Sequence, residues 1–182
     1  LKDNYQTILK LTKENNLDYL VNEEIKLSKV LGDMEIKGLK IDVNRLQEIG
    51  DLLNEKAEVV RKKIYDIAGE EFNINSPVQL GEVLFEKLGL PHGKKNKRGY
   101  STDEATLSKL KGYPIIDNIL EYRMLTKLYS TYIEGLKNNV LSDGKIHTIY
   151  TQTLTRTGRL SSIEPNLQNI PIRNEYGRLI RK

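Results

Sequence analysis

The sequence predicts a mainly α-helical fold, with a pair of long antiparallel helices, short helices across one end of the pair, and a small β-hairpin or irregular segment at the C-terminus. Apolar residues recur every three or four positions over residues 43–68 and again over residues 114–138, which is the period of an amphipathic helix. Alternation typical of a strand occurs over residues 145–153, after the turn signal Asp143-Gly144. We therefore expect two helices that pack side by side along most of their length.

Composition narrows the class of protein. Of 182 residues, 38% are hydrophobic and 30% are charged, which suits a helix-rich globular protein with a substantial core. The net charge is only +4, but basic residues gather in the acid-free stretch 87–102 and in the C-terminal tail, and two separated basic surfaces suit a polyanion. Cysteine is absent, which is compatible with the cytoplasm, the expected location. No apolar run reaches membrane-spanning length. The first residue is not Met, which indicates a piece of a longer protein.

The N-terminal part of the chain is expected to hold two helices. Residues 1–21 should form a short helix and a connector. A second helix is expected to begin after Asn22, whose side chain would cap it, and to end at Gly38. Its expected buried stripe is Ile25, Val30, Leu31 and Met34. Residues 39–41 should be extended, and Asp42 should cap the long helix that follows.

The next segment begins with a strong helix start. Ser76 is the expected cap, with Pro77 at the first helical position, and the helix should run to Leu88 and stop at Gly89. The loop over residues 91–100, PHGKKNKRGY, then brings four cations within five positions. A charge run of this kind is usually a solvated loop, and it can also serve as a flexible phosphate clamp. The lone His92 in this loop lacks partners at metal-ligand spacing.

Two further helix starts follow the basic loop. Ser101 and Glu104 have the spacing of a capping box, which predicts a short helix to about Lys111. Pro114 is expected to open the second long helix, which should extend to about Asn138. This helix completes the expected antiparallel pair.

The run of residues 155–173, TRTGRLSSIEPNLQNIPIR, has the composition of a recognition surface. It has almost no hydrophobic period, so burial in a core does not explain it. Arginine side chains supply forked donors for phosphate oxygens or base edges, and the amides of Asn and Gln both donate and accept. Gly158 allows the backbone to approach a ligand closely. The simpler alternative is a polar loop with two proline turns.

The sequence of this run resembles the segment that enters the palm of family A DNA polymerases, the bacterial DNA polymerase I type. In that segment T-G-R-L-S-S is followed by P-N-L-Q-N-I-P-x-R. Three earlier runs resemble the thumb of the same family in the same order: FNINSPVQLG at 72–81, GYSTDEATL at 99–107 and EYRMLTKLYSTYI at 121–133. The resemblance covers roughly residues 25–182. It implies a thumb domain at 22–140 and the start of a palm domain at 141–182. Residues 1–21 lie outside the resemblance and are expected to be a connector from a preceding domain.

The resemblance also implies where DNA would bind. The paired long helices would lie along the minor groove of a primer-template duplex. The basic loop over residues 91–100, which we call the tip loop, would contact phosphates. Arg159 matches the family arginine that reaches into the minor groove near the primer terminus. The DNA-binding residues implied in this way are Lys94, Lys95, Lys97 and Arg98 in the loop, and Arg159, Asn166, Gln168, Asn169 and Arg173 in the polar run.

The same resemblance implies that catalysis needs more than this chain. Two-metal nucleotidyl transfer requires paired carboxylates, which in the family lie in later motifs resembling D-Y-S-Q-I-E and H-D-E. Neither motif occurs here. We therefore expect part of a DNA-directed DNA polymerase of replication or repair that grips DNA and has no catalytic residue or metal site of its own. Deoxynucleoside triphosphates and two Mg ions would bind the intact protein. The alternative is a stand-alone, non-enzymatic helical module that binds nucleic acid or protein.

Overall fold

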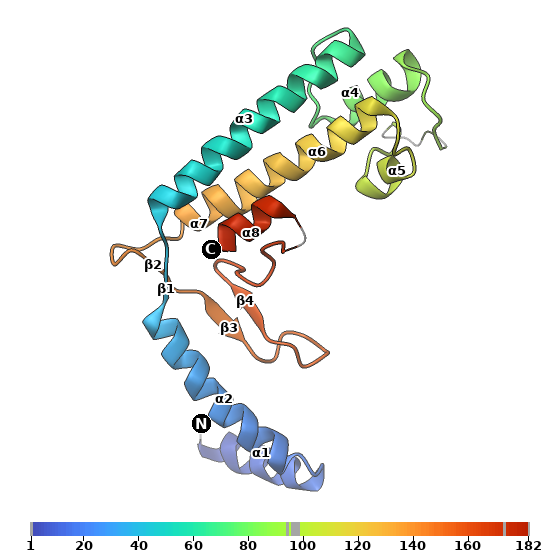
Figure 1. Ribbon diagram of the computed structural model, residues 1–182. Coiled ribbons are helices and arrows are strands. Elements are labelled where there is room, and N and C mark those ends of the chain that lie inside the picture. The colour runs from blue at the N-terminus through green and yellow to red at the C-terminus, as the bar shows by residue number, and fades with distance from the viewer. Residues whose placement is uncertain (1, 94, 96–98, 173, 182) are drawn as a thin grey trace. The chain divides into compact units, whose positions relative to one another are not determined.

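The computed structural model describes residues 2–93, 95, 99–172 and 174–181. The chain forms two compact units. One consists of Leu1–Asp42 with Gly135–Pro171, and the other of Val43–Glu134 with Ile172–Lys182. The predicted mainly helical class is confirmed, as is the small β-hairpin near the C-terminus (Figure 1).

The second unit is built on the two long helices that the apolar periods predicted. Helix α3 (Val43–Ala68) packs along α6 (Pro114–Leu128), and the two run antiparallel (Figure 1). After α6 the helix continues as a π-helical turn, η2 (Tyr129–Glu134), and ends in α7 (Gly135–Lys137). The α3 residues at the seam are Leu46, Ile49, Gly50, Leu53, Ala57, Val60 and Ile64, all buried. A Cβ at Gly50 would lie 2.9 Å from Ile133 Cγ2, so α3 and η2 approach too closely for a larger residue.

Short helices cover the end of this pair where α3 finishes and α6 begins. Helix α4 (Pro77–Gly81) starts as predicted, since Ser76 Oγ accepts the Gln79 N–H at 3.4 Å. It continues into the π-helical turn η1 (Glu82–Lys87), and Gly89 follows with a φ of 65°.

The capping box predicted for the next helix is wrong. Helix α5 (Glu104–Ser108) is capped by Asp103, whose carboxylate accepts the Thr106 N–H at 2.7 Å. Ser101 supports this cap from outside by donating its hydroxyl to Asp103 Oδ2 at 2.6 Å. A carboxylate carries its full charge to the positive end of the helix, which favours Asp over Ser in this position.

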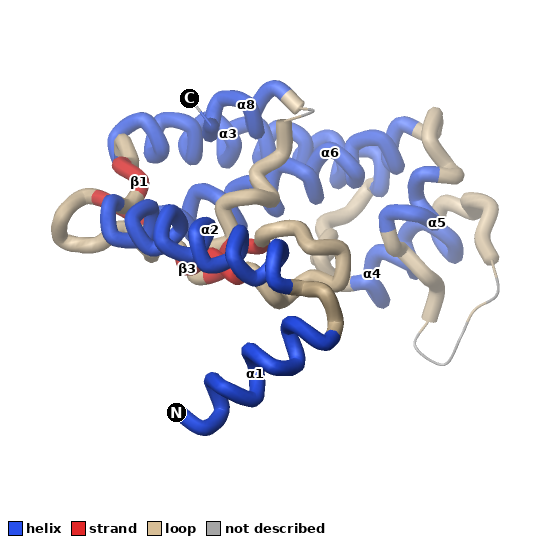
Figure 2. Tube along the Cα trace, turned by 90° about the horizontal axis from the view of Figure 1, so that it is seen from below, coloured by secondary structure: helices blue, strands red, loops and turns tan. Residues whose placement is uncertain are grey.

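Helix α8 (Glu175–Arg181) differs from the irregular tail that the sequence predicted. Asn174 caps it, with Oδ1 accepting the Gly177 N–H at 2.5 Å, and Arg178 and Arg181 lie in its last turn. It packs against α3 (Figure 2). Lys56 Nζ on α3 lies 5.3 Å from the centre of the Tyr176 ring. Asn followed by Glu is a helix-start signal that the sequence already contained.

The first unit begins with α1 (Lys2–Glu14) and α2 (Asp18–Lys37). The predicted start at Asn22 is wrong, because Asn16 takes a left-handed φ of 54° and lets the chain re-enter a helix at once. Helix α2 contacts α1 and a later strand, and of its predicted stripe only Leu31 is buried. The other three predicted positions, Ile25, Val30 and Met34, are about half exposed.

Two short antiparallel strand pairs complete this unit. Strand β1 (Leu39–Lys40) pairs with β2 (Lys145–Ile146), and β3 (Ile149–Thr151) pairs with β4 (Ser161–Ile163). The alternation predicted over residues 145–153 is therefore split between two strands. Within the described residues, no helix combines the length and the apolar character that crossing a bilayer requires.

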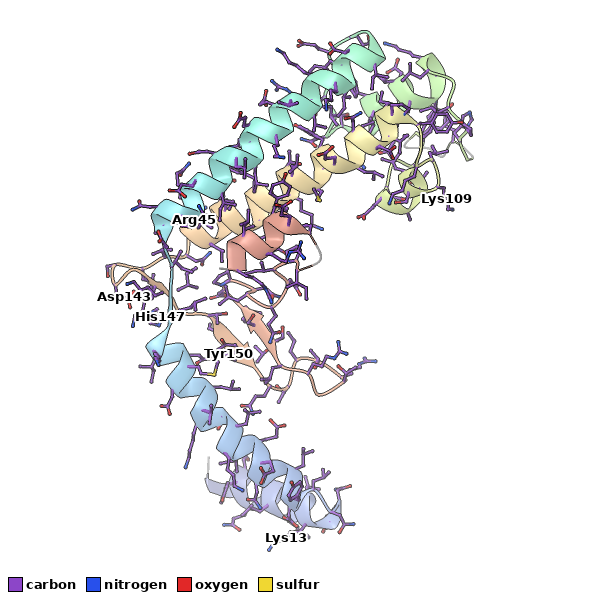
Figure 3. All side chains as sticks on the ribbon, in the orientation of Figure 1. Lys13, Arg45, Lys109, Asp143, His147 and Tyr150 are labelled. Atoms are coloured by element: carbon purple, nitrogen blue, oxygen red, sulfur yellow. The ribbon has the colours of Figure 1, made fainter. Side chains whose placement is uncertain are left out.

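His147 ties the C-terminal turn of α2 to the loop that precedes β2. Its Nδ1 lies 2.6 Å from the Glu35 carbonyl oxygen, and its Nε2 lies 3.0 Å from Asp143 Oδ2 (Figure 3). Both partners can only accept, so both contacts are hydrogen bonds at the same time only when the imidazole carries two protons. The Glu35 carbonyl, and then the Asp143 carboxylate, raise the pKa of His147. The hydrogen bond from His147 in turn lowers the pKa of Asp143.

This pairing predicts a pH-dependent stability. Because the pKa of His147 is raised on folding, its contribution is complete below the ordinary value of about 6.5 and is lost as the pH rises through the higher folded value. The lowered pKa of Asp143 gives a contribution that is present above about 3.9 and lost as the pH falls through the lower folded value. His147→Gln should therefore lower the melting temperature more at about pH 5.5 than at about pH 8.5.

The measurement is thermal unfolding followed by circular dichroism at both pH values. His92→Gln, which changes the exposed histidine of the other unit, is the matched control. A His147→Gln deficit of equal size at both pH values would contradict the pairing.

Candidate nucleic-acid interface

The loop between β3 and β4 carries the arginine that the sequence singled out. Residues 152–160 connect the two strands, which pair in the register Ile149↔Ile163, Tyr150↔Ser162 and Thr151↔Ser161. Thr155 Oγ1 donates a hydrogen bond to the Arg159 carbonyl oxygen at 2.6 Å, which links the two sides of the loop. Gly158, with a φ of 70°, makes the reversal just before Arg159, whose side chain is exposed. The Thr155 hydroxyl therefore shapes the turn.

The segment after β4 makes a second ordered turn. Ser162 Oγ accepts the Leu167 N–H at 3.0 Å, and Asn166 Oδ1 accepts the Gln168 N–H at 3.0 Å. Asn166, Gln168 and Asn169 are exposed, while Ser162 is completely buried. The Asn166 amide group keeps its N–H donors for a ligand even though its oxygen serves the turn.

The structure brings four of the predicted DNA-binding residues into one compact unit. Arg159 belongs to the first loop, and the three amide side chains belong to the second, directly after the paired strand β4. They form a set of exposed donors and acceptors on a backbone that short hydrogen bonds hold. We refer to residues 155–169 as the polar hairpin.

The sequence missed two side chains behind this surface, Thr148 and Ser162. Thr148 Oγ1 lies 2.9 Å from the Ile163 carbonyl oxygen and 2.8 Å from the Pro165 carbonyl oxygen. A signal for Thr148 was present, because it shares the inward-facing alternation with Ile146, which is buried. A polar residue at an apolar position of a strand indicates a buried hydrogen bond.

The basic tip loop belongs to the other unit. Lys95 Nζ lies 2.6 Å from Glu86 Oε1 and 4.9 Å from the centre of the Tyr100 ring. The hydrogen bond between Glu86 and Lys95 lowers the pKa of the carboxyl group and raises the pKa of the amine. Tyr100 also contacts His92 and Phe85, whose rings lie 4.7 and 5.0 Å away between centroids. His92 thus packs in an aromatic cluster, in agreement with the absence of metal-ligand spacing around it.

The remaining predicted DNA contacts, Lys94, Lys97, Arg98 and Arg173, lie outside the described residues. The roles assigned to all nine residues stay predictions. Within the part of the chain that the structure describes, no group of three or more His, Asp or Glu side chains is placed to hold a metal ion.

Comparison with known proteins identifies the family. Residues 43–182 match the family model described as DNA polymerase family A. This chain belongs to DNA polymerase family A. The predicted resemblance is thereby confirmed.

Relatives within family A are close in sequence. DNA polymerase I of Lactococcus lactis subsp. cremoris (strain MG1363) is 54% identical over 171 residues, which cover 93% of this chain and 20% of that protein. DNA polymerase I of Bacillus caldotenax is 56% identical over 174 residues, with the same coverage of each chain. The chain thus spans about a fifth of the length of these relatives.

A solved structure supports the fold of this family A chain. It is the POL domain of Pol1 from M. smegmatis in complex with DNA primer-template and dNTP. The two are 40% identical, with a TM-score of 0.82, and the match covers 95% of this chain and 31% of that chain.

The backbone conformations of Gly158 in the polar hairpin and Gly32 in α2 predict opposite effects for Gly→Ala changes. At Gly158 a Cβ would meet open space, but the φ of 70° is costly for alanine, so Gly158→Ala should destabilise the chain by about 1–2 kcal/mol. At Gly32, inside α2, a Cβ also meets open space, and Gly32→Ala should stabilise by about 0.5–1 kcal/mol because alanine favours the helix. Urea unfolding of both variants measures the difference, and shifts of the same sign would contradict it.

Proposed function

We propose that this chain is the part of a DNA-directed DNA polymerase that grips the primer-template duplex. The observation that carries the proposal is the polar hairpin of a family A chain, where Arg159 and three exposed amides stand on a hydrogen-bonded backbone. The presence of DNA primer-template and dNTP in the complex of the M. smegmatis Pol1 domain supports it. Family membership favours this interpretation over a separate binding module.

Arg159 would act on the minor groove. Purine N3 and pyrimidine O2 present acceptors there for every correct base pair, so a guanidinium fork can test pairing geometry without choosing a base. Such a test requires a fixed approach. The Thr155 hydroxyl holds the backbone of Arg159 itself, and Gly158 sets the direction in which the side chain leaves the loop.

Asn166, Gln168, Asn169 and Arg173 would extend the contact along the duplex and the templating strand. Amide side chains suit this role, since each can donate to base or sugar acceptors and accept from donors. Their exposure, where the structure describes it, leaves them accessible to a ligand.

The tip loop would supply phosphate contacts through Lys94, Lys95, Lys97 and Arg98. Such contacts hold DNA without reading its sequence, as a replicating enzyme needs. The exposed pair of Lys95 with Glu86 is the kind of surface ion pair that contributes little, so a phosphate can replace the carboxylate.

The full-length protein would carry out template-directed nucleotidyl transfer in replication or repair in the bacterial cytoplasm. Deoxynucleoside triphosphates and two divalent metal ions, Mg being the expected metal, would bind carboxylates that lie outside this chain. We assign residues 1–21 to a connector, 22–140 to the thumb and 141–182 to the start of the palm. The two compact units divide the chain at other positions, after Asp42, Glu134 and Pro171.

The role of Arg159 leads to a kinetic prediction. In the full-length polymerase, Arg159→Ala should lower kcat/KM for extension of a matched primer by about ten- to a hundredfold, since it removes a forked contact to base edges. Arg159→Lys should recover only part of the loss, because a lysine keeps the charge and loses the fork. Single-turnover primer extension with matched and mismatched termini is the measurement. Lys26→Ala, on an exposed face of α2, is the control. Unchanged extension by Arg159→Ala would exclude the proposed role.

The role of Lys95 leads to a second prediction. A plot of log affinity for duplex DNA against log salt concentration should become shallower by about 0.9 in Lys95→Ala, because one phosphate contact is lost. Fluorescence anisotropy of a labelled primer-template, titrated with the full-length protein at several salt concentrations, provides the slopes. Lys26→Ala removes a similar exposed lysine, paired with Glu23 at 2.7 Å in the other unit, and should leave the slope unchanged. A Lys95→Ala slope equal to the control would remove Lys95 from the interface.

A further inference from the structure

Two buried hydroxyl groups lie directly behind the second turn of the polar hairpin. Thr148 is 4% exposed and Ser162 is 0% exposed. Both come from the strand segments on which the hairpin is built, Thr148 just before β3 and Ser162 in the centre of β4. Neither side chain is accessible to DNA.

Thr148 fixes the point at which the chain leaves β4. Its single hydroxyl proton is shared between the carbonyl oxygens of Ile163 and Pro165, at 2.9 and 2.8 Å. These carbonyls flank Glu164, which takes a φ of 56°, a region that a glutamate rarely adopts. One hydroxyl group therefore bridges the residue at which the backbone reverses and holds it there.

Ser162 fixes the other end of the turn. It is paired across the ladder with Tyr150, and its Oγ accepts the Leu167 N–H at 3.0 Å. Asn166 Oδ1 then accepts the Gln168 N–H. The turn over residues 163–168 is thus held by the buried hydroxyls of Thr148 and Ser162 and by the exposed amide of Asn166.

We propose that Thr148 and Ser162 are positioning residues for DNA binding, holding the turn in the shape that presents Asn166 and Gln168 to the duplex. The inference rests on the proposed function and adds to it two residues that do not touch DNA. A recognition group that is held before binding loses less conformational freedom on binding, so its contacts contribute more affinity.

The chemistry of Thr148 makes the inference testable. Valine has nearly the same shape as threonine but cannot donate, so Thr148→Val leaves the two carbonyls without their donor. Thr148→Ser keeps the hydroxyl and loses only a methyl group. In the full-length protein, Thr148→Val should weaken binding of a primer-template duplex by about fivefold, the equivalent of one net hydrogen bond, and Thr148→Ser should stay within about twofold of the wild type.

A double-mutant cycle separates positioning from general loss of structure. Thr148→Val is measured by fluorescence anisotropy in the wild type and in an Asn166→Ala/Gln168→Ala background. If Thr148 acts through these two amides, its substitution should cost less than about twofold once they are gone. An equal cost in both backgrounds, or no cost in the wild type, would overturn the inference.

The cycle also distinguishes this inference from the proposed function. If Asn166→Ala/Gln168→Ala binds DNA as the wild type does, the proposed role of the turn fails and the positioning role fails with it. If the double alanine variant binds weakly while Thr148→Val binds normally, only the positioning role fails. Should Thr148→Val not fold at the assay temperature, Ser162→Ala replaces it in the same cycle, with the same expected and contradicting outcomes.

Discussion

The packing of α3 along α6 is the interaction on which the second unit depends. Burying a large aliphatic side chain contributes about 1.5–3 kcal/mol, and α3 alone buries Leu46, Ile49, Leu53, Val60 and Ile64 at this seam. Exposed ion pairs such as Arg45 with Glu48 each contribute under about 1 kcal/mol. The apolar seam therefore decides the architecture. The charged outer face of α3 keeps the helix soluble without directing its fold.

The packed helix pair also carries the tip loop at one end. The short helices at its end are anchored by completely buried side chains, among them Leu80, Leu84 and Leu107. At the tip, Lys95 contacts an exposed carboxylate, that of Glu86, and the ring of Tyr100. A lysine on such a firm base needs little rearrangement to exchange one anion for another. Such an exchange would suit the proposed phosphate contacts, which form and break as a polymerase moves along DNA.

The sequence predicted the long elements well and the local caps less well, for a physical reason. Helix α3 has the predicted bounds because many side chains repeat one period, and each supports the same answer. A cap depends on a single hydrogen bond. At α5 both Ser101 and Asp103 were chemically able to form it, and the carboxylate prevailed through its charge at the helix end. The apolar face of α2 was misjudged because periodicity shows which residues can be buried, whereas burial requires a partner element.

In the candidate site, too, the sequence predicts the residues that follow a pattern but not those whose role depends on a tertiary contact. Its exposed residues were predicted from the sequence, because Arg159 and the amides lie in a polar run that has no apolar period and resembles a family motif. The residues that hold them were missed, because the inward-facing position of Thr148 signals a buried hydrogen bond but does not identify the partners of its hydroxyl. Its role comes from two carbonyls fifteen and seventeen positions away, which no local pattern reveals. In the proposed function this surface would accept every correct base pair, so its discrimination would rest on how firmly its donors are held. In this chain the buried hydroxyls hold the backbone of the turn and leave exposed the amide side chains that we propose contact DNA.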